Sequence, residues 1–86
     1  MTDVKTNERP IGSVAALLWH LERTNRDEYE SAKHLIFDSS VSTTWLAGAF
    51  NHIVRYDDVR DRAGRLAHIT GSKIRNYRAD NLKGDQ

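Results

Sequence analysis

The amino-acid sequence predicts an all-α protein, a compact bundle of four to five short helices. Apolar residues recur at spacings of three and four along most of the chain, which is the period of one helix face. No segment alternates apolar and polar residues between glycine or asparagine turns, as a half-buried strand does. The 86 residues have room for one domain with a core of roughly a dozen side chains.

We expect a flexible arm over residues 1–12, a single helical domain over residues 13–82 and a frayed C-terminus over residues 83–86. The chain has no cysteine, so disulfides and thiolate metal sites are excluded. Its longest apolar run, Val14 to Trp19, is too short for a membrane span or a signal peptide. A cytoplasmic protein held together by packing is the simplest prediction.

The first two helices are predicted from their N-cap residues and from the stripe of apolar residues along one face of each helix. Ser13 is a good N-cap for the first helix, which ends near Arg23. The inward stripe of this helix is Val14, Leu17, Leu18 and Leu21. Thr24 or Asn25 caps the second helix, because a carboxylate follows each of them three residues later. The inward stripe of the second helix is Tyr29, Ala32, Leu35 and Ile36.

The third helix has the best-marked start in the chain. Ser42 is its N-cap, and Val41 can pack on Leu46 as a hydrophobic staple. The stripe continues with Ala49, Phe50 and Ile53. The pattern then either runs on or breaks at Asp57 and Asp58, whose carboxylates suit the positive end of a new helix. We favour a break there.

Two further helices complete the prediction. A fourth segment buries Val59, Ala63, Leu66 and Ala67. It ends around Thr70 and Gly71. The last helix runs from Ser72 to about Asn81, with Ile74 and Tyr77 facing inward.

Positive charge is concentrated toward the C-terminal end. Residues 1–59 hold six Lys and Arg against nine Asp and Glu, a net charge of −3, whereas residues 60–86 hold seven against three, a net charge of +4. No acidic residue lies between Arg62 and Ala79. A basic end on a weakly acidic body indicates an anionic partner, and nucleic acid is the commonest one.

The last helix has the composition of a helix that reads a major groove. With Ile74 inward, a helical wheel centres the outward face on Ser72, Asn76 and Ala79, and Arg75 lies beside them. Small residues permit close approach, while Asn and Arg side chains make bidentate contacts to adenine and guanine. Lys73 and Arg78 lie on the flanks of this helix, where cations suit phosphates. The further residues predicted to contact phosphates are Arg62, Arg65 and Lys83.

The segment from Ala63 to Leu82 also resembles a helix-turn-helix unit. Gly71 lies at the turn four residues after Ala67, where a small residue lets two helices cross closely and a glycine can adopt the left-handed conformation. The family pattern has an apolar residue just after the turn and another late in the second helix. This chain has Ser72 and Asp80 there.

A second resemblance covers about residues 35–80. The run DSSVSTTWLAGAF, followed by ITGSKIRNYRAD, is similar to small phage and prophage helix-turn-helix proteins, in which a Trp-Leu-Ala helix precedes a short basic helix. Here about 20 residues separate the two elements, which is room for an additional helix. The resemblance implies DNA contacts from Ser72, Lys73, Arg75, Asn76 and Arg78.

The sequence contains no motif that indicates metal binding or catalysis. No two of the four histidines have the spacing of a helical metal site, so we expect no metal and no cofactor. There is no nucleophile elbow and no phosphate-cradling glycine loop, so we expect no enzyme. Trp19 and Trp45 lie in helical stripes and are interpreted as core or edge-of-core residues.

The sequence is therefore consistent with two classes of function. The first is a small DNA-binding protein of the phage regulator type, acting on double-stranded DNA as a homodimer or with a protein partner. The second is a helical adaptor or inhibitor that binds another protein through its basic helix or through an exposed surface of Trp45 and Phe50. A ring-forming DNA-packaging subunit shares the predicted fold and differs in oligomeric mass.

Overall fold

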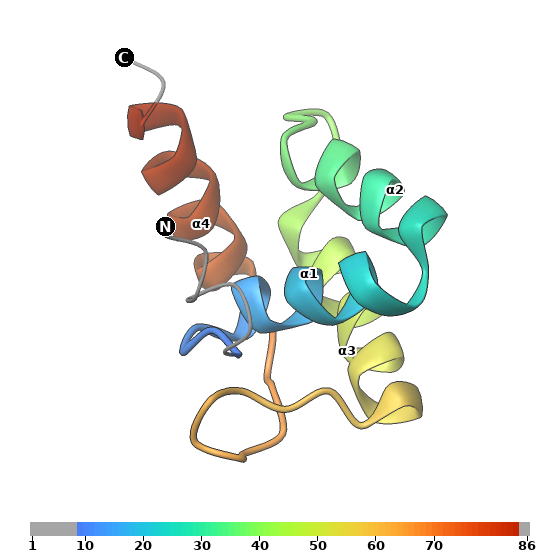
Figure 1. Cartoon of the computed structure of the whole chain (residues 1–86). Coiled ribbons are helices and arrows are strands. Elements are labelled where there is room, and N and C mark those ends of the chain that lie inside the picture. Colours follow the sequence, from blue (N-terminus) through green and yellow to red (C-terminus); the bar gives the residue numbers. More distant parts are fainter. Residues whose placement is uncertain (1–8, 85–86) are drawn as a thin grey trace, which may run out of the picture.

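The computed structural model of the chain describes residues 9–84 and contains four helices. These are α1 (Ser13–Thr24), α2 (Arg26–Ile36), α3 (Thr43–Asp57) and α4 (Gly71–Gly84). Figure 1 shows α1 at the centre, with α2 and α3 beside it and α4 at one edge of the bundle. No strand occurs in the described part of the chain, where the only ladder contact is one isolated bridge, so the predicted all-α class is confirmed.

The starts of α2 and α3 follow local signals in the sequence. The Asn25 side chain accepts a hydrogen bond from the backbone N–H of Glu28 at 3.2 Å, which makes Asn25 the N-cap of α2. Ser42 Oγ accepts from the backbone N–H of Trp45 at 3.2 Å and caps α3 in the same way. Both predicted caps are confirmed. Each satisfies a helix donor that would otherwise have no partner within the helix.

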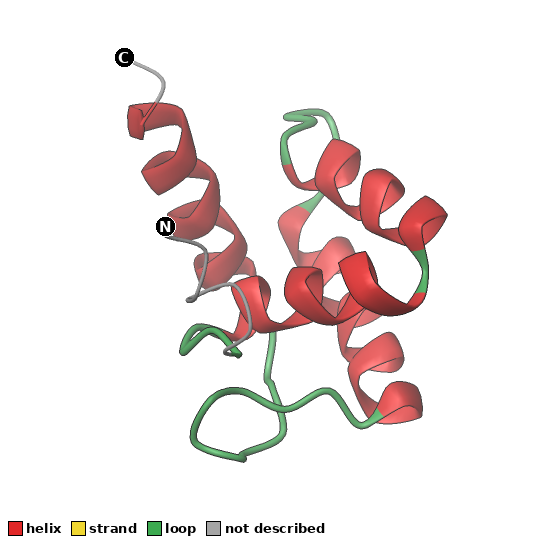
Figure 2. Cartoon of the chain, viewed as in Figure 1, coloured by secondary structure: helices red, strands yellow, loops and turns green. Residues whose placement is uncertain are grey.

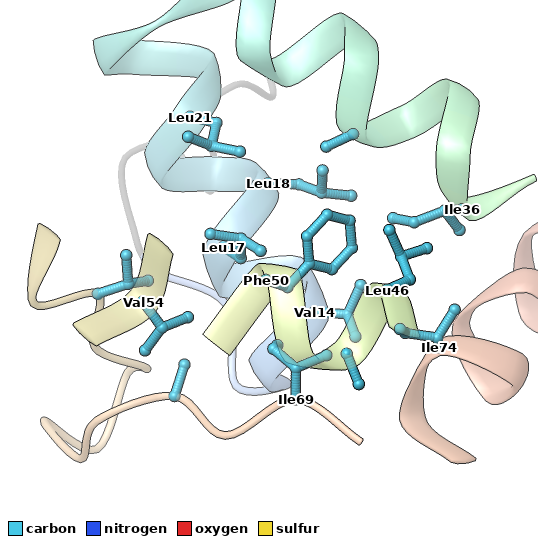
Figure 3. Packing of buried hydrophobic residues seen from close by; sticks show 14 residues of the cluster. Val14, Leu17, Leu18, Leu21, Ile36, Leu46, Phe50, Val54, Ile69 and Ile74 are labelled. Carbon is cyan, nitrogen blue, oxygen red and sulfur yellow. The ribbon is translucent and has the colours of Figure 1, made fainter. Parts of the chain in front are cut away.

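All four helices contribute to one core. Leu17, Ile36, Leu46 and Ile74, one from each helix, are completely buried. Figure 3 shows the ring of Phe50 between the side chains of α1 and those of the C-terminal end of α2, with Ile69 closing the cluster from the loop below. Burial of large side chains of this kind contributes about 1.5–3 kcal/mol each, so the core is the main source of stability.

The predicted fourth helix is absent. Residues 58–70 form a loop (green in Figure 2) that joins α3 to α4. Asp58 is left-handed, with φ of 56°, and ends α3 instead of starting a new helix. Gly64, with φ of 86°, turns the loop, and Arg60 then pairs with Leu66 in the isolated bridge. The predicted break at Asp57 and Asp58 is therefore confirmed, but the prediction that a new helix starts there is wrong.

The pattern of buried residues along the loop explains why a helix was predicted there. Val59, Ala67 and Ile69 are buried, while Ala63, Leu66 and His68 are exposed. From residue 66 to residue 69 exposed and buried side chains alternate, which is the period of extended chain and not of a helix. The run is too short for that period to stand out in the sequence.

The N-terminal end of the domain is tied to this loop. Arg62 donates from its backbone N–H to the Pro10 carbonyl at 3.0 Å and from Nε to the Arg9 carbonyl at 2.8 Å. Ser13, predicted as an N-cap, instead accepts from the backbone N–H of His68 at 3.1 Å, and no side chain caps α1. Residues 1–8 of the predicted flexible arm lie outside the described residues. Among the helices of the described chain, none has the length and apolar character needed to cross a membrane.

Candidate nucleic-acid interface

Helix α4 begins one residue earlier than predicted, because Thr70 caps it. Thr70 Oγ1 accepts from the backbone N–H of Lys73 at 3.1 Å, and the Thr70 carbonyl accepts from Ile74. Gly71 is therefore the first helical residue and not the left-handed turn of a helix-turn-helix. Its small size still matters, since a Cβ atom at this position would lie 3.1 Å from Thr43 Oγ1 on α3.

An asparagine fixes the chain immediately before α4. The side-chain amide of Asn51 on α3 donates to the Ile69 carbonyl at 2.8 Å and accepts from the Ile69 N–H at 2.8 Å. This pair of bonds imitates the pairing of two strands and is partly buried. Together with the completely buried Ile74, it sets the position of α4 against α3.

The exposed face of α4 carries the polar residues predicted for it. Ser72, Asn76 and Ala79 are all exposed, and Arg75 is exposed beside them. Ile74 and the half-buried Tyr77 face inward. Burial raises the pKa of the Tyr77 phenol above its ordinary value.

Arg75 joins the N-terminal ends of two helices. Its Nη1 donates to Thr43 Oγ1 on α3 at 2.9 Å, and its Nη2 donates to Ser72 Oγ at 3.3 Å. Neither α3 nor α4 has an acidic residue in its first turn. The positive ends of two helix dipoles and one guanidinium therefore lie together at the surface, an arrangement that attracts anions.

The two flanking cations of α4 have internal contacts. Lys73 Nζ donates to the His68 carbonyl at 2.8 Å, and Ser13 Oγ lies 3.4 Å away. Arg78 Nε donates to the Ile36 carbonyl at the end of α2 at 2.7 Å. Its Nη2 is buried and has no hydrogen-bond partner among the described residues. Arg78 thus ties α4 to α2, whereas Ser72, Arg75 and Asn76 share the outer surface.

The predicted phosphate contacts are dispersed. Arg65 is exposed and borders a groove of about 570 Å³ between α1, the loop and α4. Asp61 and Asp80 line the same groove, so its charge is mixed. Arg62 holds the chain at Arg9, as described above. The side chain of Lys83 lies outside the described residues, although its backbone belongs to α4.

Sequence reasoning missed Asn51 and the hydrogen bond from Arg75 to Thr43. The signal for Asn51 was a polar residue beside the apolar stripe of α3, next to Ala47 and Val54 on a wheel. Trp45, expected in the core or at its edge, is 61% exposed. Phe50 is buried, which confirms its place in the inward stripe and contradicts the alternative of an exposed surface that contains both Trp45 and Phe50.

The described residues contain no group of three His, Asp or Glu side chains that could hold a metal ion. What distinguishes this surface is the arrangement of a polar helix face, a guanidinium and two helix ends. In comparisons with protein-family models, with curated proteins and with solved structures, the chain matches none of them.

Proposed function

We propose that this chain binds double-stranded DNA, with α4 in the major groove and α3 as its supporting helix. The observation that carries the proposal is the junction of Arg75 with Thr43, which combines two acid-free helix ends with the polar face of α4. Helix-turn-helix proteins place their second helix in the major groove and use helix ends for backbone phosphates, whereas α3 and α4 of this chain are joined by the loop over residues 58–70.

The residues divide into roles by position. Asn76 and Arg75 are exposed on the outer face and have the chemistry to read base edges. Ser72 and Ala79 are small and permit close approach. The backbone at Thr43 lies where a phosphate would meet the positive end of α3. Lys73 and Arg78, by contrast, serve mainly to hold α4 in place in this proposal.

A single helix of this size reads only a few base pairs. Two copies on a two-fold site are therefore part of the proposal, and a transcriptional regulator is the role that the sequence resemblance implies. A packaging subunit would use the same face of α4 and differ in forming a ring.

The test is a fluorescence-anisotropy titration of labelled duplex DNA at several salt concentrations. A handful of phosphate contacts predicts a log-log slope of about −0.9 per contact. Arg75→Ala should weaken binding by roughly 10-fold or more, which is the effect expected for one bidentate base contact. Arg55→Ala removes the same charge from the exposed outer side of α3 and is the matched control. Absent or salt-independent binding, or equal effects of the two substitutions, would refute the proposal.

A protein-interaction module is the second candidate, and the exposure of Trp45 and Tyr56 favours it. Pull-down with and without nuclease separates the two functions. A partner that survives nuclease treatment supports the module, whereas capture of DNA that nuclease removes supports the first proposal.

A further inference from the structure

The outer side of α3 carries a second helical stripe that is exposed except at Ala49, which is partly buried. Its residues are Trp45, Ala49, His52 and Tyr56, at spacings of four, three and four. Trp45 is 61% exposed and Tyr56 is 86% exposed, which leaves two large aromatic side chains mostly in water. Spacing of this kind is what one helix needs to pack along another.

The stripe faces away from the proposed DNA surface. Trp45 lies two residues after Thr43, about 200° around the helix, and Thr43 is the residue that contacts Arg75 of α4. Gly48 is exposed in the middle of α3, and a Cβ atom there would meet no other atom within 4 Å. A glycine in mid-helix costs stability, and the space beside this one is open.

A hollow lies at the other end of the stripe. It has a volume of about 310 Å³ and is lined by Leu21, His52, Ile53 and Tyr56, with Glu28 and Asp57 at its polar side. It is large enough to receive an indole side chain. The protruding Trp45 and this hollow are thus both on one helix face, about 16 Å apart at 1.5 Å per residue.

We infer that two copies of this chain pair through α3 in antiparallel orientation, each inserting Trp45 into the hollow beside Tyr56 of the other. A two-fold axis near the middle of the stripe places the large residues of each end opposite one another and the small residue Ala49 near the centre.

The area available predicts a weak dimer. Trp45 and Tyr56 each leave roughly 150–200 Å² to cover, so the four aromatic side chains of two copies supply about 600–800 Å². Stable interfaces bury about 1,200–2,000 Å² in total, so the dimer should be weak. The pairing requires no DNA and leaves both α4 helices accessible.

The experiment is sedimentation equilibrium of the full chain without DNA, from about 5 to about 500 µM, a range that extends to the concentrations at which a weak dimer forms. The wild type should shift from monomer to dimer. Trp45→Ala and Tyr56→Ala should each raise the dissociation constant at least ~30-fold, as for residues at an interface centre. Ile11→Ala, an equally exposed apolar residue off the stripe, should leave it unchanged.

Three results would overturn the inference: a monomer throughout, a dimer that neither α3 substitution weakens, or a dimer that responds to only one of them. Far-UV circular dichroism of each variant controls for folding. Because the test omits DNA, its failure leaves the binding of DNA by α4 untouched and rejects only this arrangement of two copies.

Discussion

The bonds between Asn51 and Ile69 are the clearest point at which the position of α4 can be perturbed. Asn51→Ala removes one donor and one acceptor, both at 2.8 Å from the Ile69 backbone. Each such bond contributes about 0.5–1.5 kcal/mol net, and leaving a polar group without a partner adds to the loss. The site is only partly buried, so water satisfies Ile69 in part. The expected loss is about 2–3 kcal/mol.

That loss is a large share of the total stability, which for 86 residues should be about 4–13 kcal/mol. In a domain of this size each 1 kcal/mol lowers the midpoint of thermal unfolding by about 4–8 °C, so Asn51→Ala should lower it by roughly 10–20 °C. Thermal and urea unfolding followed by far-UV circular dichroism measure both quantities.

Two further variants control this prediction. Asn51→Asp keeps an acceptor for the Ile69 N–H but loses the donor, so it should be destabilised like Asn51→Ala, with a loss that shrinks as acid protonates its carboxylate. Arg55→Ala, one turn along α3 and exposed, should change stability by less than about 0.5 kcal/mol. A loss for Asn51→Ala no larger than that of Arg55→Ala would refute the coupling of α4 to α3 through this asparagine.

Three other predictions concern stability. Arg78→Met should cost about 1.5–3 kcal/mol in urea unfolding, because the bond to the Ile36 carbonyl is lost; an unchanged midpoint would contradict that anchoring role. Gly48→Ala should stabilise the monomer by about 0.5–1 kcal/mol, since the site is helical and open, and a lower melting temperature at micromolar protein would count against it. The hydrogen bond from Arg60 lowers the pKa of Asp58, so this carboxylate contributes stability above its ordinary pKa of 3.8 and loses it as the pH falls below that value. Asp58→Asn should therefore reduce the difference between urea midpoints at pH 6 and at about pH 3, and an unchanged difference would argue against the bond.

The parts of the fold that were predicted correctly from the sequence are those that depend on short-range signals. The caps at Asn25 and Ser42 involve residues three positions apart, so they can be read directly from the chain. The loop over 58–70 was misread as a helix because its apolar residues alternate over only four positions. Such a run is too brief for its period to be distinguished from that of a helix.

The candidate site was predicted less completely, because its supports are long-range. Asn51 and Ile69 are 18 residues apart, and Arg78 and Ile36 are 42 residues apart. Helical periodicity placed Arg78 on the flank of α4, but it could not show that the flank lies against the end of α2. The exposure of Trp45 was missed for a similar reason, since the stripe of α3 that contains it has the same spacing as the stripe that packs inside.

The most direct test of the central claim is amide chemical-shift mapping of the labelled protein with a duplex of random sequence. DNA binding through α4 predicts that the largest shifts cluster on residues 71–81 and at Thr43 and Thr44, with little change in the middle of α2. Shifts confined to α1 and α2, or no shifts at low salt, would contradict it.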